Sequence, residues 1–525
     1  MTAATAQAAP LPAEEPIDRA KLAVFCVMAF GMFMAILDIQ IVAASLPQIQ
    51  AGLAASPEQV SWVQTSYLIA EVMMIPISGY LARALSTRIL FALSAGGFTL
   101  ASFGCAMSWN MESLIVMRAV QGFVGGAMIP TVFATAFSAF PRSKAGPLSA
   151  AIGLIVTLAP TIGPTLGGAI SEHLSWHWLF LVNIIPGILI TVTVYLYAEF
   201  DEPEPGMLKR FDVTAFVFLA VWLGLGEYIL EEGPSDDWFE SRTITILTIV
   251  SAVAGAAFIL RTIRSDRPLV ELRAFRDVNF TMGCLIALSM GVALFGLVYL
   301  LPLFLARVEG LNSLQIGETL FVTGAAMFVA APLAGIGARK YDPRLIAGAG
   351  LAVLAVSTWQ MATLTSEWGY WDLFWPQVGR GVGLMWTMAS LNVIALGTLP
   401  VSLMGGAAGL YNLMRNLGGA AGLAIINTVL TDRTAFHMRV LSDNLDPSRP
   451  AMAERLSALT ALLHGQGVAE PQAGAVKILS QIVEREAMTM AFADAILLVT
   501  IVCVVAIFSL FLVRPPTQPA PTGAH

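Results

Sequence analysis

Five ionisable side chains lie deep inside apolar stretches of the sequence. Asp38 stands in the middle of "FMAILDIQIVAASLP", and we interpret Asp38 and Glu71 as the acids that lie at membrane depth. The matching bases are Arg118, Arg380 and Arg415. Charged groups in such surroundings face a protein interior or a watery cavity and find partners there. These five residues are therefore the first candidates for proton or ligand chemistry.

The stretches that hold these residues are predicted to be transmembrane helices. The chain of 525 residues is 57% hydrophobic and only 12% charged, which is typical of a membrane protein with many spans. A helix of about 20 residues crosses roughly 30 Å of hydrocarbon. A window of that length predicts fourteen spans and an all-α fold, at residues 22–46, 58–80, 88–108, 112–135, 146–171, 176–198, 211–230, 242–260, 278–305, 314–335, 344–363, 371–397, 403–430 and 487–512.

Basic residues in the short loops indicate the orientation. Lys and Arg gather on the side of the N-terminus, whereas the opposite short loops hold only Arg242 and Arg307. The positive-inside rule then places both termini in the cytoplasm and the acidic loop "EEGPSDDWFE" (Glu231 to Glu240) outside. A long outer segment, 431–486, separates the last two spans and contains helical pieces such as "AERLSALTALLHG".

Helix geometry predicts which of the buried charges meet. With a rise of about 1.5 Å per residue, Asp38 and Arg118 lie at similar depth, so we expect them to pair. Gly122, Gly125 and Gly126 follow Arg118 and allow close approach of a neighbouring helix. The second span carries a polar stripe on one helical face, which we expect to line a cavity; it consists of Ser61, Gln64, Glu71 and Ser78.

An internal repeat predicts the domain organisation. "MRAVQGFVGG" and "GRGVGLMW" each place an Arg before glycines in a span that runs inward. Two parallel six-helix repeats with an inserted pair account for fourteen spans, and such repeats are typical of alternating-access transporters with a site at midplane. The predicted units are a disordered tail 1–20, a first bundle 21–198, inserted helices 199–277, a second bundle 278–512 and a tail 513–525. Expected cavity residues are Gln64, Glu71, Met74, Arg380, Asn412, Arg415 and Asn416.

Five stretches in order resemble one family. "LDIQIVAASLP", "IVMRAVQGFVGGAMIP", "LAPTIGPTLGGAI", "SWHWLFLVNIIPG" and "GLYNLMRNLGGAAG" are similar to the motifs of fourteen-span drug:proton antiporters of the major facilitator superfamily, closest to its EmrB branch. The resemblance covers about residues 22 to 512. It implies a bacterial inner-membrane exporter of lipophilic or amphipathic compounds, driven by the proton gradient without another cofactor. It also implies a periplasmic membrane-fusion adaptor (EmrA-like) and an outer-membrane channel (TolC-like).

The resemblance assigns roles to matching positions. Asp38 and Arg118 fall on residues used for proton coupling, to which we add Glu71 as a candidate. The helix-bend antiporter motif falls on Pro160, Gly163, Pro164, Gly167 and Gly168. The sequence departs from the family pattern at several positions: Arg83 replaces an Asp and Ser86 a Gly after the second span, Gln40 and Ala43 replace Thr and Asn, and His177 replaces Arg.

Other interpretations stay open at this point. Asp38 and Glu71 can be structural hydrogen-bonding groups, and either of them can be the proton carrier. The chain can also be a dedicated exporter of one metabolite or siderophore, or a receptor or scaffold that does not transport. Covalent catalysis has little support, since no GxxxxGK[ST] or HExxH motif occurs. His173 and His177 are spaced like metal ligands, but Trp176 and Trp178 favour an aromatic belt at the membrane interface, and no metal or disulfide is expected.

Overall fold

The computed structural model describes residues 18–141, 144–265, 268–311, 313–443, 450–466 and 469–514, and these are helical wherever they are regular. The N-terminal elements are α1 (Arg19–Ala44), α2 (Leu46–Leu53), α3 (Pro57–Met74), η1 (Ile75–Ile77), α4 (Ser78–Leu85), α5 (Thr87–Ala106), α6 (Met111–Gly125), α7 (Met128–Ser138), α8 (Ala145–His173), α9 (Trp178–Leu181) and α10 (Ile184–Tyr197). Then follow η3 (Pro205–Arg210), α11 (Val213–Glu232), η4 (Trp238–Glu240), α12 (Arg242–Arg264) and η5 (Leu272–Arg276). The C-terminal elements are α13 (Val278–Arg307), α14 (Ser313–Lys340), α15 (Pro343–Met361), α16 (Tyr370–Leu396), α17 (Val401–Asp443), α18 (Pro450–Gly465) and α19 (Pro471–Leu510).

The all-α prediction is confirmed, and most predicted spans are single long helices. In the described part of the chain, 12 helices are long and apolar enough to cross a membrane. A thirteenth candidate is α8, whose segments Pro147–Pro160 and Ile162–His173 meet at a 40° bend. α16 spans 27 residues but falls outside this group. The number of fourteen membrane crossings therefore stays a prediction.

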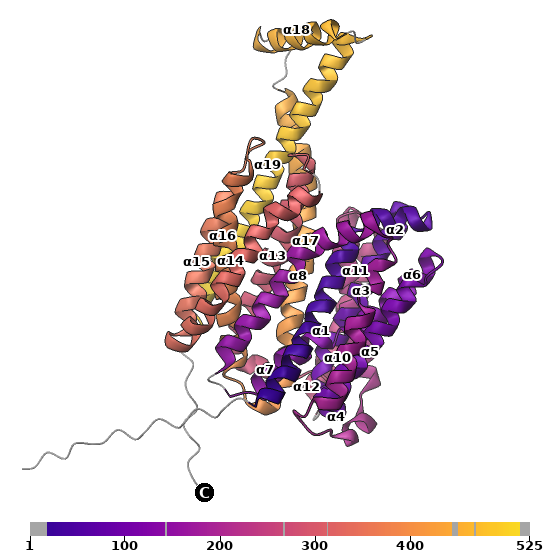
Figure 1. Ribbon diagram of the computed structural model, residues 1–525, viewed down its shortest axis with the longest axis vertical. Helices are drawn as coiled ribbons and strands as arrows, with labels where there is room; N and C mark the ends of the chain where they lie inside the picture. Colours follow the sequence, from indigo (N-terminus) through magenta and orange to yellow (C-terminus); the bar gives the residue numbers. More distant parts are fainter. Residues whose placement is uncertain are drawn as a thin grey trace, which may run out of the picture.

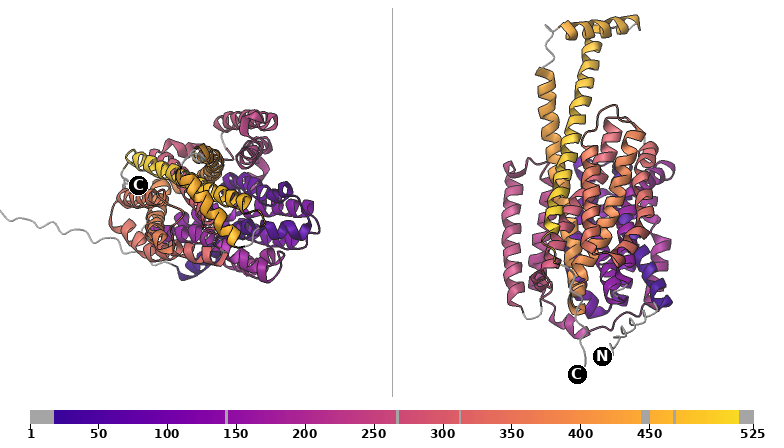
Figure 2. Two further views of the ribbon diagram at one scale, coloured as in Figure 1. Left: turned by 90° about the horizontal axis from the view of Figure 1, so that it is seen from above. Right: turned by 90° about the vertical axis from the view of Figure 1, so that its left-hand side faces the viewer.

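The helices form two bundles with an inserted pair beside them. α1 to α10 make one bundle and α13 to α19 the other, and the two stand side by side (Figure 1). α8 lies along α1 in its own bundle and also packs against α14 and α16 of the other. The inserted helix α11 packs against α3 and α17, one from each bundle, whereas α12 lies outside it, against α11 (Figure 2). α11 therefore covers a seam between the bundles.

Glycines allow the helices of each bundle to touch through their backbones. A Cβ atom at Gly122 of α6 would lie 2.2 Å from the carbonyl oxygen of Tyr67 on α3. One at Gly167 of α8 would lie 2.5 Å from the carbonyl oxygen of Ile41 on α1. Any larger residue would push these helix pairs apart, so the small residues fix the positions of α3 and α1, which carry the acidic candidates.

The two bundles pack tightly at one end. We call this end, where α1 begins and α19 finishes, the terminal side, and the opposite end the α18 side (Figure 2). On the terminal side, a Cβ at Gly79 of α4 would lie 2.4 Å from the backbone of Gly405 on α17. Arg83, at the end of α4, forms an ion pair with Glu271 across 3.6 Å. The bundles are thus closed against each other on the terminal side.

The long segment between the last two spans is an extension of the bundle. α17 continues to Asp443 and α19 begins at Pro471, so both helices project beyond their neighbours and carry α18 at the tip (Figure 1). Asp494 of α19 holds the pair together, since its Oδ2 lies 2.6 Å from Nε of Arg433 and 2.7 Å from Nε2 of His437 on α17. We call α18 and the projecting parts of α17 and α19 the helical extension.

Candidate functional site

Asp38 and Arg118 form an ion pair in the interior of the N-terminal bundle. Nη1 of Arg118 lies 2.6 Å from Oδ2 of Asp38, and neither side chain is exposed to solvent. Asp38 lies six residues before the end of α1, and Arg118 lies in the middle of α6. Their similar depth in the predicted spans indicated that they could meet. An ion pair of this kind needs further hydrogen bonds to offset the loss of water.

A ring of amide and hydroxyl groups supplies those hydrogen bonds. Asn183 donates to Oδ1 of Asp38 at 2.7 Å, and Gln121 donates to the same oxygen at 3.3 Å. Gln121 also accepts from Nη1 of Arg118 at 2.8 Å and donates to Ser102 at the same distance. The pair therefore belongs to a five-residue network from α1, α5, α6 and the start of α10.

The guanidinium of Arg118 also ties α6 to α3. Nε donates to the carbonyl oxygen of Val63 at 3.0 Å, and the group lies over the ring of Tyr67, 4.2 Å from its centre. Nη2 is buried without a hydrogen-bond partner among the described residues. Arg118 therefore connects Asp38 of α1 to the backbone and a ring of α3.

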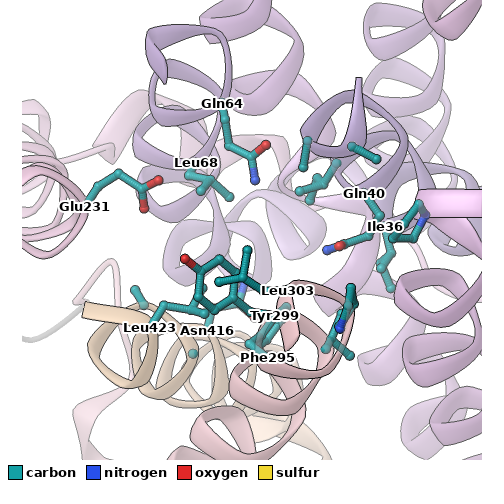
Figure 3. A pocket seen from close by; sticks show the side chains of 18 of the residues that line it. Ile36, Gln40, Gln64, Leu68, Glu231, Phe295, Tyr299, Leu303, Asn416 and Leu423 are labelled. Carbon is teal, nitrogen blue, oxygen red and sulfur yellow. The ribbon is translucent and has the colours of Figure 1, made fainter. Parts of the chain in front are cut away.

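A large cavity lies between the two bundles. Its volume is about 630 Å³, and it is lined by residues of α1, α3, α8, α11, α13 and α17, with smaller contributions from α2, α7 and α14. Figure 3 shows part of the lining, with Gln64 and Leu68 of α3 on one side and Tyr299 of α13 on the other. The lining also includes Gln48 of α2 and Glu172 near the end of α8. Since the bundles are closed on the terminal side, the cavity lies toward the α18 side.

Glu71 is the acidic residue of α3 in this cavity. Its side chain lines the cavity although only 4% of the residue is exposed, and none of the described residues forms a hydrogen bond or ion pair with it. Arg415, Arg118 and Asp38 are close enough to interact with it electrostatically. A ligand or a proton in the cavity can thus reach Glu71, whereas Asp38 is enclosed in its network.

Three further predicted residues line the same cavity. Gln64 lies about two helical turns from Glu71, and its Oε1 is buried without a hydrogen-bond partner among the described residues. Arg415 and Asn416 enter from α17, and two guanidinium nitrogens of Arg415 likewise lack such a partner. Buried polar atoms without partners are rare and costly in proteins. These groups are free to receive a polar ligand.

Three predicted cavity residues lie elsewhere. Met74 is buried against Gly126, directly after α6, and Asn412 donates to the carbonyl oxygen of Ala408 in its own helix at 2.9 Å. Arg380 is 2% exposed in α16 and does not line the cavity. All three residues lie in predicted spans, but position along a span does not say toward which neighbour a side chain points.

The glycines and prolines of α8 lie on two faces of the helix, one toward the cavity and one toward α1. Pro164 and Gly168 line the cavity, whereas Gly163 and Gly167 press against Gln40 and Ile41 of α1. Pro160 ends the first segment of the bent helix. A proline inside a helix removes a backbone hydrogen bond, which explains a bend at this point.

The sequence analysis placed only two acids, Asp38 and Glu71, in the membrane interior, and it omitted two others. Glu227 lies in the predicted span 211–230, is 6% exposed and lines the cavity. Glu231, expected in an outer loop, instead occupies the last turn of α11 and also lines it. The spacing of these two acids by four residues was visible in the sequence, but nothing in the sequence placed α11 against the cavity.

The network around Asp38 contained other residues that were not anticipated. Gln121 follows Arg118 by three residues and therefore shares its helical face, which was a usable signal. Asn183 and Ser102 gave no such signal, because their spans were not expected to touch α1. The described residues contain no group of His, Cys, Asp or Glu suited to a metal ion.

Comparison with known proteins agrees with this architecture. Residues 28–423 match the model of the Major Facilitator Superfamily. The chain is 41% identical over 486 residues to the colistin resistance protein EmrB of Acinetobacter baumannii, covering 93% of this chain and 95% of that one. It is 29% identical to the multidrug export protein EmrB of Escherichia coli, covering 88% and 89%.

The fold is also found among solved structures. The human organic anion transporter MFSD10 matches with a TM-score of 0.57 and 14% identity, covering 93% of this chain and all of that one. This likeness shows the fold alone, whereas the family match over most of the chain shows the relationship. The chain belongs to the major facilitator superfamily of membrane transporters.

Proposed function

We propose that this transporter is a proton-driven exporter of lipophilic or amphipathic compounds in the bacterial inner membrane, with its terminal side in the cytoplasm. The drug-export and resistance names of its relatives support the substrate class. The observation that carries the proposal is Glu71, a nearly buried carboxyl group that faces the cavity without a hydrogen-bonding partner. A proton and a substrate would compete for this group.

In this proposal, Glu71 carries the proton and the network around Asp38 transmits its state. With the cavity toward the α18 side, Glu71 takes up a proton from outside after the substrate has left. Neutral Glu71 no longer attracts Arg415 on α17, so the bundles are free to separate on the terminal side and release the proton there. Arg118 contacts both Asp38 and the backbone of α3, which links the acid on α1 to the helix that carries Glu71.

Proton movement in proteoliposomes tests this proposal. We expect Glu71→Gln to abolish substrate-linked proton movement while the variant still binds substrate. Asp38→Asn should slow exchange, because it disturbs the network without removing the carrier. If Glu71→Gln and Asp38→Asn both exchange protons for substrate at the wild-type rate, neither acid couples transport.

We also propose that the helical extension docks a periplasmic adaptor. The proposal is supported by its projection beyond the bundle and by exposed apolar residues such as Leu462 and Val476, which are 56% and 53% exposed. An EmrA-like adaptor co-purified with the full chain should be lost from a Leu462→Asp, Val476→Asp variant. Retention of the adaptor by this variant would place the docking surface elsewhere.

A further inference from the structure

We propose that Glu227 and Glu231 of the inserted helix α11 form a binding site for the cationic group of an amphipathic substrate. This inference deepens the proposed function, on which it rests, by naming the charge of the exported compounds and the residues that select it. The inserted pair α11 and α12 would then contribute directly to substrate selection.

The position of α11 brings both carboxyl groups to the cavity. The helix packs against α3 and α17 at the seam between the bundles. Glu227 and Glu231 are four residues apart and therefore share one helical face. Both line the cavity, and Figure 3 shows Glu231 at its edge, with Gln64 and Leu68 of α3 beside it.

Neither carboxyl group has a cationic partner among the described residues. No hydrogen bond or ion pair joins Glu227 to them, although 94% of this residue is buried, as its 6% exposure shows. The charged groups that interact with it are Glu231 on its own helix and Glu71 on α3, both acidic. When both groups are ionised, they repel each other across four residues of one helix, and burying the two charges without a partner costs more. A bound cation would relieve both costs.

The rest of the cavity fits an amphipathic cation. Its charged lining residues are four acids and a single base, namely Glu71, Glu172, Glu227, Glu231 and Arg415. Most other lining residues are apolar, and Tyr299 lines the same cavity as the two acids. An aromatic face adds to the attraction that carboxylates exert on an organic cation. An organic anion would be repelled by the four acids when they are charged and attracted only by the one arginine.

Two ions of the same shape and opposite charge test the proposal. We would measure equilibrium binding of tetraphenylphosphonium and tetraphenylborate to the purified full-length protein in detergent. The wild type should bind the phosphonium more tightly than the borate. Each of Glu227→Gln and Glu231→Gln should weaken phosphonium binding by about tenfold, the change expected when one ion pair worth about 1.4 kcal/mol is lost. Borate binding should not fall.

The neighbouring acid Glu232 provides a matched control. It is on the same helix and also acidic, but it does not line the cavity, so Glu232→Gln should bind both ions like the wild type. Borate binding shows that each variant is folded. Equal binding of the two ions by the wild type, or wild-type phosphonium binding by both cavity variants, would overturn the cation site.

The binding measurement requires no proton gradient, which separates it from the proposed function. If the cavity variants bind phosphonium normally while Glu71→Gln abolishes proton exchange, the cation site is wrong and proton-driven export stands. If phosphonium binding depends on Glu227 and Glu231 while proton exchange is independent of Glu71, the cation site stands and the coupling scheme is wrong.

Discussion

Asp38 and Arg118 lie 80 residues apart in the chain and are joined by a distance of 2.6 Å in the interior of one bundle. Glu71, the other predicted acid, faces the cavity without such a partner. The two acids therefore have different roles open to them. Asp38 can set the positions of helices, whereas Glu71 can exchange a proton or a ligand with the cavity.

Loss of one partner of the buried pair should destabilise the protein. We expect Arg118→Ala to lower the free energy of unfolding by about 3 to 5 kcal/mol, because Asp38 is left charged and unpaired away from water. Thermal unfolding in detergent would measure the effect. Adding Asp38→Asn should recover part of the loss, and a double mutant that is as unstable as the sum of both single mutants would contradict a direct interaction.

Replacing Ser86 with glycine should stabilise the protein. Ser86 has a backbone φ of 80° and ψ of 152°, a region that side chains with a Cβ rarely adopt. Its hydroxyl accepts only a long hydrogen bond, 3.4 Å, from Ile89 N. We expect Ser86→Gly to stabilise the protein by about 1 kcal/mol, since the strain exceeds the few tenths lost at the helix cap. A lower melting temperature for this variant would show that serine is not strained here.

The ion pair between Arg83 and Glu271 should hold the terminal side closed. Arg83 stands where the family usually has an acid, and its partner precedes the second bundle. Both side chains are partly shielded, so we expect a contribution of about 0 to 1 kcal/mol. In a background that lacks the four native cysteines, Arg83→Ala should increase maleimide labelling of Ser78→Cys by up to about fivefold. Exchanging the two charges should restore slow labelling; unchanged labelling in Arg83→Ala would rule out a closing role.

The contact between α3 and α6 should not tolerate a methyl group. We expect Gly122→Ala to destabilise the protein by about 1 to 3 kcal/mol, because its Cβ would lie 2.2 Å from the carbonyl oxygen of Tyr67. Gly226→Ala on α11 is the matched control, since the nearest atom to its Cβ would be the Ser251 hydroxyl at 4.0 Å. Unfolding midpoints in detergent should fall for the first variant only, and equal midpoints would contradict the close packing.

The interaction between Asp212, at the start of α11, and Arg261 of α12 should be lost at low pH. Asp212 precedes α11, and a hydrogen bond from Arg261 of α12 lowers the pKa of its carboxyl group. A lowered pKa in the folded state adds stability above the unfolded value of about 3.9, and this stability is lost as the pH falls through the folded value. The melting temperature of the wild type should therefore exceed that of Asp212→Asn at pH 5 to 7. The difference between the two melting temperatures should disappear below about pH 4. If the wild type still has the higher melting temperature at low pH, the charge of Asp212 is not the cause of the difference.

The sequence determined the all-α class, and it predicted the positions of the polar residues along each span. Long apolar runs in a membrane leave the backbone no alternative to helix, and a fixed rise per residue turns position into depth. That was sufficient to predict the pairing of Asp38 with Arg118. It was also sufficient to group Gln64 with Glu71 on one face, because both residues belong to the same helix.

Only the tertiary structure decided which side chains share a space. Met74, Asn412 and Arg380 lie in predicted spans, but they do not line the cavity. Glu227 and Glu231 face it because α11 packs across the seam between the bundles. The direction in which a membrane helix faces and its choice of neighbours depend on packing between helices, since lipid and protein interior are equally apolar. Such contacts between distant segments leave no periodic trace in the sequence.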